Sequence, residues 1–166
     1  MRKAFVFAVI VAASGIVSTV RAERAIDISE LLTAQNKYRA DLGLLPLRWS
    51  DSLAQSAQQW ANQLAQLDLM KHSGNDGVGE NLAMWRSGKA SLTKLVDLWG
   101  AEKQYFVHAD FPSVTATGDW EKVGHYTQLV WKDTTDVGCG LATGGGNDFL
   151  VCQYSPRGNI FGEKVY

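Results

Sequence analysis

Histidine and cysteine, the side chains that most often bind metals or transfer protons, are rare in this chain. Most of these residues lie outside the periodic apolar patterns that predict helices. The 166 residues include three histidines and two cysteines. His72 opens a glycine-rich loop, and His125 stands at the start of the segment Gly124–Trp131. Imidazole titrates near neutral pH and binds divalent cations, so both positions are candidates for metal binding or proton transfer. His108 lies among aromatic residues and is expected to pack or to face water.

Glu102 is unusual because it occupies the core-facing row of a predicted helix. From Ser91 onward, residues recur at intervals of three and four, and the row consists of Leu92, Leu95, Trp99, Glu102 and Phe106. A carboxylate in such a row loses hydration unless a partner compensates it. Two interpretations remain open: a carboxylate paired inside the fold, or one at the edge of the row that reaches water.

The two cysteines are predicted to pair across a β-hairpin. Two strand-like segments, 137–142 and 149–154, flank a glycine-rich turn. If the last residue of the first segment faces the first residue of the second, Cys139 lies directly opposite Cys152, at a separation that a disulfide tolerates. Closing so short a loop is expected to contribute about 3 kcal/mol to stability.

Two more helices are predicted before the hairpin. The first spans about 28–41, with Asp27 and Glu30 placed as a capping box. The second begins after Ser50 as N-cap, and its apolar row consists of Leu53, Ala57, Trp60, Leu64 and Leu67. Both helices therefore have one face suited to a shared core.

The first 22 residues predict a secretory signal peptide. Arg2 and Lys3 precede an uncharged run, and small residues stand before a cleavage site after Ala22. The alternative is a membrane anchor, which the small and polar residues within the run disfavour. We therefore expect export, outside the cell or into the periplasm of a Gram-negative bacterium, with 23–166 as a single domain. Such a compartment preserves a disulfide.

Composition excludes several other classes of protein. The chain is 46% hydrophobic and 20% charged, with a formal net charge of −1, which indicates one ordinary globular domain. It offers no basic surface for nucleic acid. The glycine run at 144–146 precedes no helix, so it predicts a turn and no organic cofactor. Nothing in the sequence indicates an oligomeric state.

The remaining motifs form an ordered series from about Ile28 to Tyr166. They are His72-Ser73, Gly79–Leu82, Trp99 with Glu102, Gly124–Trp131, Val137–Gly140 and Val151–Asn159. This series resembles the CAP superfamily, the family of cysteine-rich secretory proteins, venom antigens and plant pathogenesis-related proteins. The resemblance implies an α+β fold, a three-layer α-β-α sandwich of the CAP (SCP) type, with the hairpin disulfide on Cys139 and Cys152.

The resemblance also implies a cleft formed by His72, Glu80, Glu102 and His125. In such a cleft the two histidines hold a divalent cation, commonly zinc, with solvent completing the coordination shell. A catalytic zinc usually has three protein ligands, so a cation on two imidazoles is expected to be weakly held and to leave as they protonate. The four side chains are equally suited to a buried polar brace.

Two functions follow from the resemblance. The first is an extracellular binding or defence-type module for a lipid, sterol or protein ligand, and the aromatic stretch 105–120 either covers such a ligand or packs on itself. The second is a zinc-dependent, peptidase-like hydrolase with Glu80 or Glu102 as general base. We adopt the first, leave catalysis undecided, and expect the tail from Ile160 to Val165 to pack on the sheet.

Overall fold

The structure is a computed structural model that describes residues 25–166. The predicted signal peptide, 1–22, lies outside these residues. The helices and strands follow in the order α1 (Ile28–Ala40), β1 (Arg48–Trp49), α2 (Asp51–Leu67), β2 (Gly79–Arg86), α3 (Leu92–Gly100), α4 (Gly124–Leu129), β3 (Asp136–Gly144) and β4 (Asn147–Ser155). Two short 3₁₀ helices, η1 (Ala101–Tyr105) and η2 (Trp120–Val123), flank the loop between α3 and α4.

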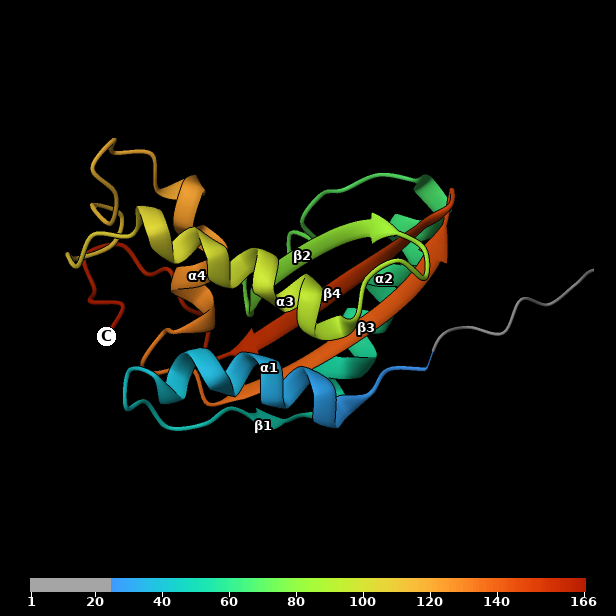
Figure 1. The fold of residues 1–166 in the computed structure, drawn as a ribbon, viewed down its shortest axis with the longest axis horizontal. Coiled ribbons are helices and arrows are strands. Elements are labelled where there is room, and N and C mark those ends of the chain that lie inside the picture. The colour runs from blue at the N-terminus through green and yellow to red at the C-terminus, as the bar shows by residue number, and fades with distance from the viewer. Residues whose placement is uncertain (1–24) are drawn as a thin grey trace, which may run out of the picture.

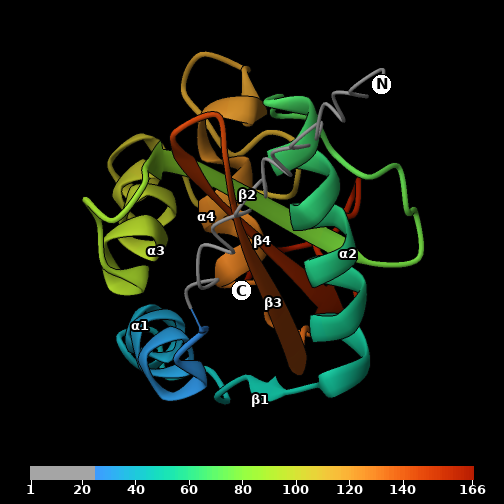
Figure 2. The ribbon, with the colours of Figure 1, turned by 90° about the vertical axis from the view of Figure 1, so that its right-hand side faces the viewer.

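The strands form one sheet between two layers of helix. Its order is β1-β3-β4-β2, with β1 parallel to β3 and the other neighbours antiparallel. Helix α2 lies on one side of the sheet, and α1 and α3 lie on the other (Figures 1 and 2). Each side has its own apolar cluster, one including residues of α1 and α3 and the other including residues of α2. The predicted α-β-α sandwich is therefore confirmed.

Glycines on β3 allow α2 to approach the sheet closely. A Cβ on Gly138 would lie 2.1 Å from the Ala54 nitrogen, and one on Gly140 would lie 2.3 Å from the Gln58 Cα. The Gln58 amide then bonds to both backbone groups of Leu141, at 2.8 and 2.9 Å. These contacts fix α2 on the strand that carries Cys139.

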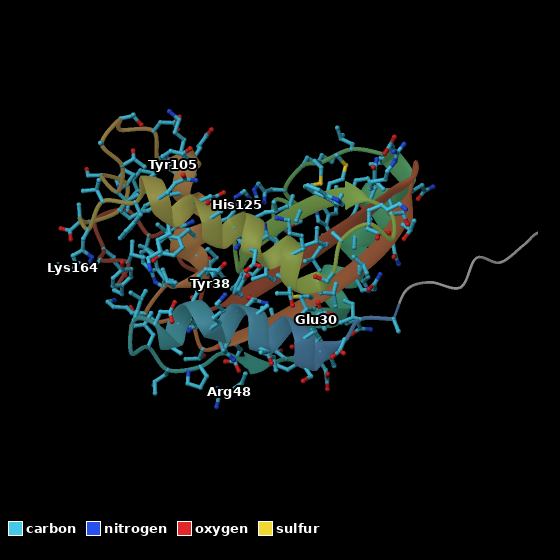
Figure 3. All side chains as sticks on the ribbon, in the orientation of Figure 1. Glu30, Tyr38, Arg48, Tyr105, His125 and Lys164 are labelled. Atoms are coloured by element: carbon cyan, nitrogen blue, oxygen red, sulfur yellow. A yellow bond between two sulfur atoms is a disulfide. The ribbon has the colours of Figure 1, made fainter. Side chains whose placement is uncertain are left out.

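The predicted helix starts are confirmed, although the cap of α1 has a different hydrogen-bond partner for Glu30. Asp27 accepts a hydrogen bond from the Glu30 nitrogen, and Ser50 accepts one from the Leu53 nitrogen. The capping box is wrong in its second half, because the Glu30 carboxylate bonds to the nitrogen and hydroxyl of Thr93. Glu30 thus joins α1 to the start of α3 (Figure 3).

For two helices the sequence predicted an apolar row that is longer, at its C-terminal end, than the buried row in the structure. Leu64 is fully buried, but Leu67 at the end of α2 is 57% exposed. Helix α3 ends at Gly100, so Glu102 lies in the following 3₁₀ helix and not in the helical row. Because the chain changes from an α-helix to a 3₁₀ helix after Gly100, the Glu102 side chain does not continue the apolar row of α3 and instead contacts α4.

The hairpin prediction is confirmed in register and in its disulfide. Cys139 lies opposite Cys152, their Cα atoms are 4.1 Å apart, and the two sulfur atoms are bonded. The strands are longer than predicted, because the ladder continues to Gly144 and Asn147. Only Gly145 and Gly146 remain as the turn, and both have positive φ angles that suit glycine.

Reduction of the disulfide is expected to lower the melting temperature without unfolding the protein at room temperature. The bond constrains the unfolded chain, and a loop of this size is worth about 3 kcal/mol. The hairpin also has a full ladder and a buried core, which remain after reduction. Thermal unfolding followed by circular dichroism, with and without reductant, measures the difference. Identical melting curves, with free thiols verified, would contradict a stabilising role for the bond.

The loop after α3 and the C-terminal tail form a third apolar cluster at one end of the molecule. Phe111, Val114 and Val165 are buried there together with residues of α4. The expectation that the tail packs on the sheet is wrong, since Val165 joins this cluster and Phe161 is 69% exposed. Tyr105 and Lys164 mark this end in Figure 3. Within residues 25–166, no helix is long and apolar enough to cross a membrane.

Candidate functional site

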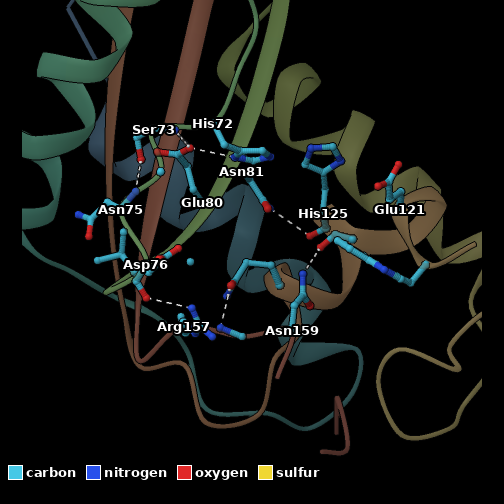
Figure 4. Close-up of a pocket in the computed structure, with 17 residues that line it drawn as sticks. His72, Ser73, Asn75, Asp76, Glu80, Asn81, Glu121, His125, Arg157 and Asn159 are labelled. Atoms are coloured by element: carbon cyan, nitrogen blue, oxygen red, sulfur yellow. Dashed lines mark hydrogen bonds and ion pairs between the residues drawn. The ribbon is translucent and has the colours of Figure 1, made fainter. Parts of the chain in front are cut away.

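A cleft of about 670 Å³ opens between the loop after α2, the start of α4 and the segment after β4. Three of the four predicted site residues line it, namely His72, Glu80 and His125. Figure 4 shows His72 with Glu80 on one side and His125 on the other. The remaining lining residues are Ser73, Gly74, Asn75, Asp76, Val78, Gly79, Asn81, Trp120, Glu121, Gly124, Gln128, Arg157, Gly158 and Asn159.

Glu80, on β2, is held by three hydrogen bonds. Its Oε1 lies 2.9 Å from His72 Nδ1 and accepts from the Ser73 nitrogen at 2.9 Å. Its Oε2 accepts from Gln153 Nε2 at 3.1 Å. Only 7% of the Glu80 side chain is exposed, whereas 62% of His72 is exposed. Glu80 is thus a fixed, nearly buried acceptor that orients an exposed imidazole.

The environment of Glu80 favours its ionised form. Burial raises the pKa of this carboxyl, but the hydrogen bonds from His72, Ser73 and Gln153 together outweigh that effect and hold the pKa below its ordinary value. At neutral pH Glu80 is therefore a carboxylate, which can only accept hydrogen bonds. His72 Nδ1 must then carry the hydrogen that it shares with Glu80.

Glu102 holds His125 in a similar way, from the opposite wall. Its Oε1 lies 2.7 Å from His125 Nδ1. Its Oε2 accepts from the backbone nitrogens of His125 and Tyr126, each at 3.0 Å. These nitrogens lie in the first turn of α4, where an α-helix supplies no carbonyl partner of its own, so Glu102 both caps the helix and orients its histidine. The paired interpretation of Glu102 is therefore correct.

Further contacts fix the position of His125. The Trp99 ring stacks on its imidazole, with centroids 6.3 Å apart, while the indole nitrogen bonds to the Leu82 carbonyl. The buried side chain of Asn81 donates to the His125 carbonyl at 3.0 Å. The ring is thus held by α3 and η1, and the backbone of His125 is held by β2.

Both pairs use the same atom of the imidazole. Each carboxylate engages Nδ1, and in neither ring does Nε2 have a hydrogen-bond partner within residues 25–166. A carboxylate on Nδ1 fixes the tautomer that leaves Nε2 as a lone-pair donor, as in histidines that bind metals. The residue types and their orientation therefore fit a cation held by imidazole nitrogens.

The charged groups of the cleft do not form a larger ligand cluster. No group of three or more His, Cys, Asp and Glu side chains in the described part of the chain is arranged to hold a metal ion. A cation would rest on the two histidines, with solvent in the other positions.

The roles of some residues at the site could not be predicted from the sequence. Gln153 is buried and orients Glu80 because β2 pairs with β4 and sets the two residues opposite each other. Strand β2 was not predicted, so its cross-strand partner could not be identified. Gly79 was part of a recognised motif, but its role is steric, since a Cβ there would lie 2.0 Å from Gln128 Oε1.

If the two histidines bind zinc, replacing Glu102 with glutamine is expected to weaken that binding about 10- to 100-fold, and it should also lower the melting temperature. The amide keeps one oxygen acceptor, whereas the carboxylate accepts at both oxygens from His125 and the start of α4. Calorimetric zinc titration and thermal unfolding measure both effects. Glu121→Gln is the matched control, because Glu121 lines the same cleft and its side chain makes no hydrogen bond or ion pair within the described residues. Equal zinc affinities in the two variants would contradict the orienting role.

Comparisons with known proteins agree with this architecture. The model of the CAP family, described as the cysteine-rich secretory protein family, matches residues 32–154. Pathogenesis-related protein 1C of Nicotiana tabacum is 40% identical over 139 residues, which cover 82% of this chain and 79% of that protein. Venom allergen 5 of Brachyponera chinensis is 38% identical over 136 residues, with 72% and 65% of the two chains covered.

Solved structures lead to the same family. The structure of BmVAL-1 superposes with a TM-score of 0.65 and 28% identity, covering 83% of this chain and 80% of the other. The family match spans both the strand that carries Glu80 and the helix that carries His125. The chain therefore belongs to the CAP family of cysteine-rich secretory proteins.

Proposed function

We propose that this chain is an exported binding module of the CAP family whose cleft holds a divalent cation, most suitably zinc, between the Nε2 atoms of His72 and His125. The observation that carries the proposal is the shared orientation of the two rings, each with Nδ1 on a glutamate. Neutral imidazole is a good zinc ligand, and a carboxylate on its other nitrogen strengthens it. Two protein ligands and solvent make a labile site.

The hydrogen bonds of the two glutamates favour a binding role over hydrolysis. A general base needs a carboxylate oxygen near the water that it activates. Every oxygen of Glu80 and Glu102 already accepts from a histidine, an amide or the backbone. These carboxylates are placed to orient histidines, so we do not assign the cleft a catalytic reaction.

We expect the ligand of such a module to be polar and not a sterol or fatty acid. An apolar ligand would need the aromatic stretch 105–120, between α3 and α4, as its cover. Phe111 and Val114 are buried against α4 and the tail, and Trp120 is the one aromatic residue of 105–120 that lines the cleft. The second of the two interpretations, a loop packed on itself, is therefore supported. One relative is named pathogenesis-related protein 1C, and this name agrees with a defence-type role.

Calorimetric titration of the metal-free protein tests the cation proposal. We expect one zinc per chain at pH 7.5, with micromolar or weaker affinity, and much weaker binding at pH 5.5 because protons compete for imidazole. Calcium, which prefers oxygen ligands, serves as the comparison and should bind far less. Absence of zinc binding at millimolar concentration, or a preference for calcium, would refute the proposal.

A further inference from the structure

One end of the cleft carries a positive charge that the proposed cation site does not use. Arg157 is the single Lys or Arg among the residues that line the cleft. The other ionised side chains of the lining are Asp76, Glu80 and Glu121. Glu80 is committed to His72. Within residues 25–166, Arg157 forms no ion pair with any carboxylate.

The guanidinium of Arg157 is held by one backbone carbonyl, and most of its N–H donors have no partner among the described residues. Its Nη1 donates to the Asp76 carbonyl at 3.0 Å, which joins the segment after β4 to the loop after α2. This is the only hydrogen bond of the guanidinium to the described residues, and the side chain is exposed. A guanidinium has five N–H donors in a planar fork, so four remain for a ligand.

A second free donor lies in the same loop. The Asn75 side-chain oxygen accepts from the Gly77 nitrogen at 3.1 Å, which fixes the orientation of its amide. Nδ2 of this amide makes no hydrogen bond within residues 25–166. In Figure 4, Asn75, Asp76 and Arg157 lie on the side of the drawn cleft away from His125. The guanidinium of Arg157 is therefore the main N–H donor group at this end of the cleft, in contrast to the glutamates beside the histidines.

We propose that Arg157 forms an anion subsite that binds a carboxylate of an acidic peptide lying along the cleft. One planar fork matches the two oxygens and single charge of a carboxylate, and this geometry is the favoured one for arginine. A phosphate dianion is usually met by several cations, and the lining offers one. A volume of about 670 Å³ suits a short peptide segment.

The inference deepens the proposed function, because a cation on the histidines adds a second positive centre to the same cleft. A peptide with two acidic residues would place one carboxylate on Arg157 and offer the other to the solvent positions of the cation. Asp76 opposes the subsite, since its own carboxylate is exposed and repels a bound anion. Removing this negative charge in the Asp76→Asn variant should therefore strengthen binding of the anion.

The test follows the amide spectrum of metal-free protein during titration with N-acetyl-Ala-Glu-Ala-amide. We expect millimolar binding, with shifts at residues 75–77 and 157–159. The Arg157→Ala variant should bind about tenfold more weakly, as for the loss of a charge-assisted hydrogen bond. The Asp76→Asn variant should bind more tightly, and Arg86→Ala, which removes an exposed arginine outside the cleft, should match the parent protein. Binding should weaken in high salt.

The same peptide with Gln in place of Glu is the ligand control. Equal binding of the two peptides, or no loss of affinity in Arg157→Ala, would overturn the subsite. Because this arm contains no zinc, its result does not depend on the cation proposal. A second arm adds zinc and N-acetyl-Glu-Ala-Glu-amide. Tighter binding only in the presence of zinc supports the bridging arrangement, and a zinc-independent affinity there refutes the bridge while leaving the Arg157 subsite intact.

Discussion

Replacing both His72 and His125 with alanine is expected to abolish zinc binding, with a loss of at least about 100-fold in affinity, since no protein ligand would remain. The fold should persist. His72 is largely exposed, and the neighbouring Glu80 keeps its bonds to Ser73 and Gln153. On the other wall, Glu102 keeps its two bonds to the backbone of α4. Each single variant should bind zinc weakly through the histidine that remains.

Calorimetry and circular dichroism on the same samples separate loss of the site from loss of the fold. His108→Ala is the control, because His108 is exposed and lies outside the cleft. It should bind zinc as the parent protein does. A folded double variant that retains zinc would refute the assignment of the ligands.

Replacing Arg39 with methionine is expected to lower the free energy of unfolding by about 3 to 5 kcal/mol. Arg39 is fully buried on α1 and has no carboxylate partner among residues 25–166. Its guanidinium donates to the carbonyls of Leu45, Leu129, Trp131 and Thr134, at 2.8 to 3.2 Å. Methionine fills the volume but leaves four carbonyl groups without these donors. The lost bonds also anchor the C-terminal end of α4, whose first turn carries His125.

Urea unfolding of Arg39→Met, Arg39→Lys and Arg48→Met measures this contribution. Lysine keeps the charge but has a single nitrogen, so it should recover part of the loss. Arg48 pairs with Asp136 at the surface and is 73% exposed, so its replacement should cost less than about 1 kcal/mol. Equal stabilities of the Arg39→Met and Arg48→Met variants would show that the buried guanidinium has no special role.

Elements governed by local patterns were predictable from the sequence. The start of α2 follows from a serine cap and a periodic apolar row, and the hairpin register follows from two short strands around glycine. In both cases neighbours along the chain determine the structure. Cys139 and Cys152 could therefore be paired before any fold was known.

Features governed by distant contacts were not predictable in this way. Strand β2 has no clean alternation, because Leu82 and Ala83 are both buried, one toward α2 and the other toward α1 and α3. Glu30 fits a local capping box, but Thr93 on another helix is its partner. The long-range partner is visible only once the two helices lie together.

At the candidate site, too, local features could be predicted from the sequence and long-range contacts could not. The carboxylate of Glu102 was recognisable as out of place, yet its two readings could not be separated without knowing that α3 ends at Gly100. The convergence of His72, Glu80, Glu102 and His125 came from the family resemblance and not from spacing. Arg157 and Gln153 lie within the motif Val151–Asn159, but their roles could not be predicted, because a single arginine or glutamine is ordinary in a polar segment.

Long-range ¹H–¹⁵N correlation spectra of the histidine rings test the central claim most directly. At pH 7.5 without metal, His72 and His125 should carry hydrogen on Nδ1 and leave Nε2 unprotonated. Zinc should then shift Nε2 of both rings and leave His108 unchanged. Either ring protonated on Nε2, or zinc-induced shifts confined to other residues, would contradict a cation site organised by Glu80 and Glu102.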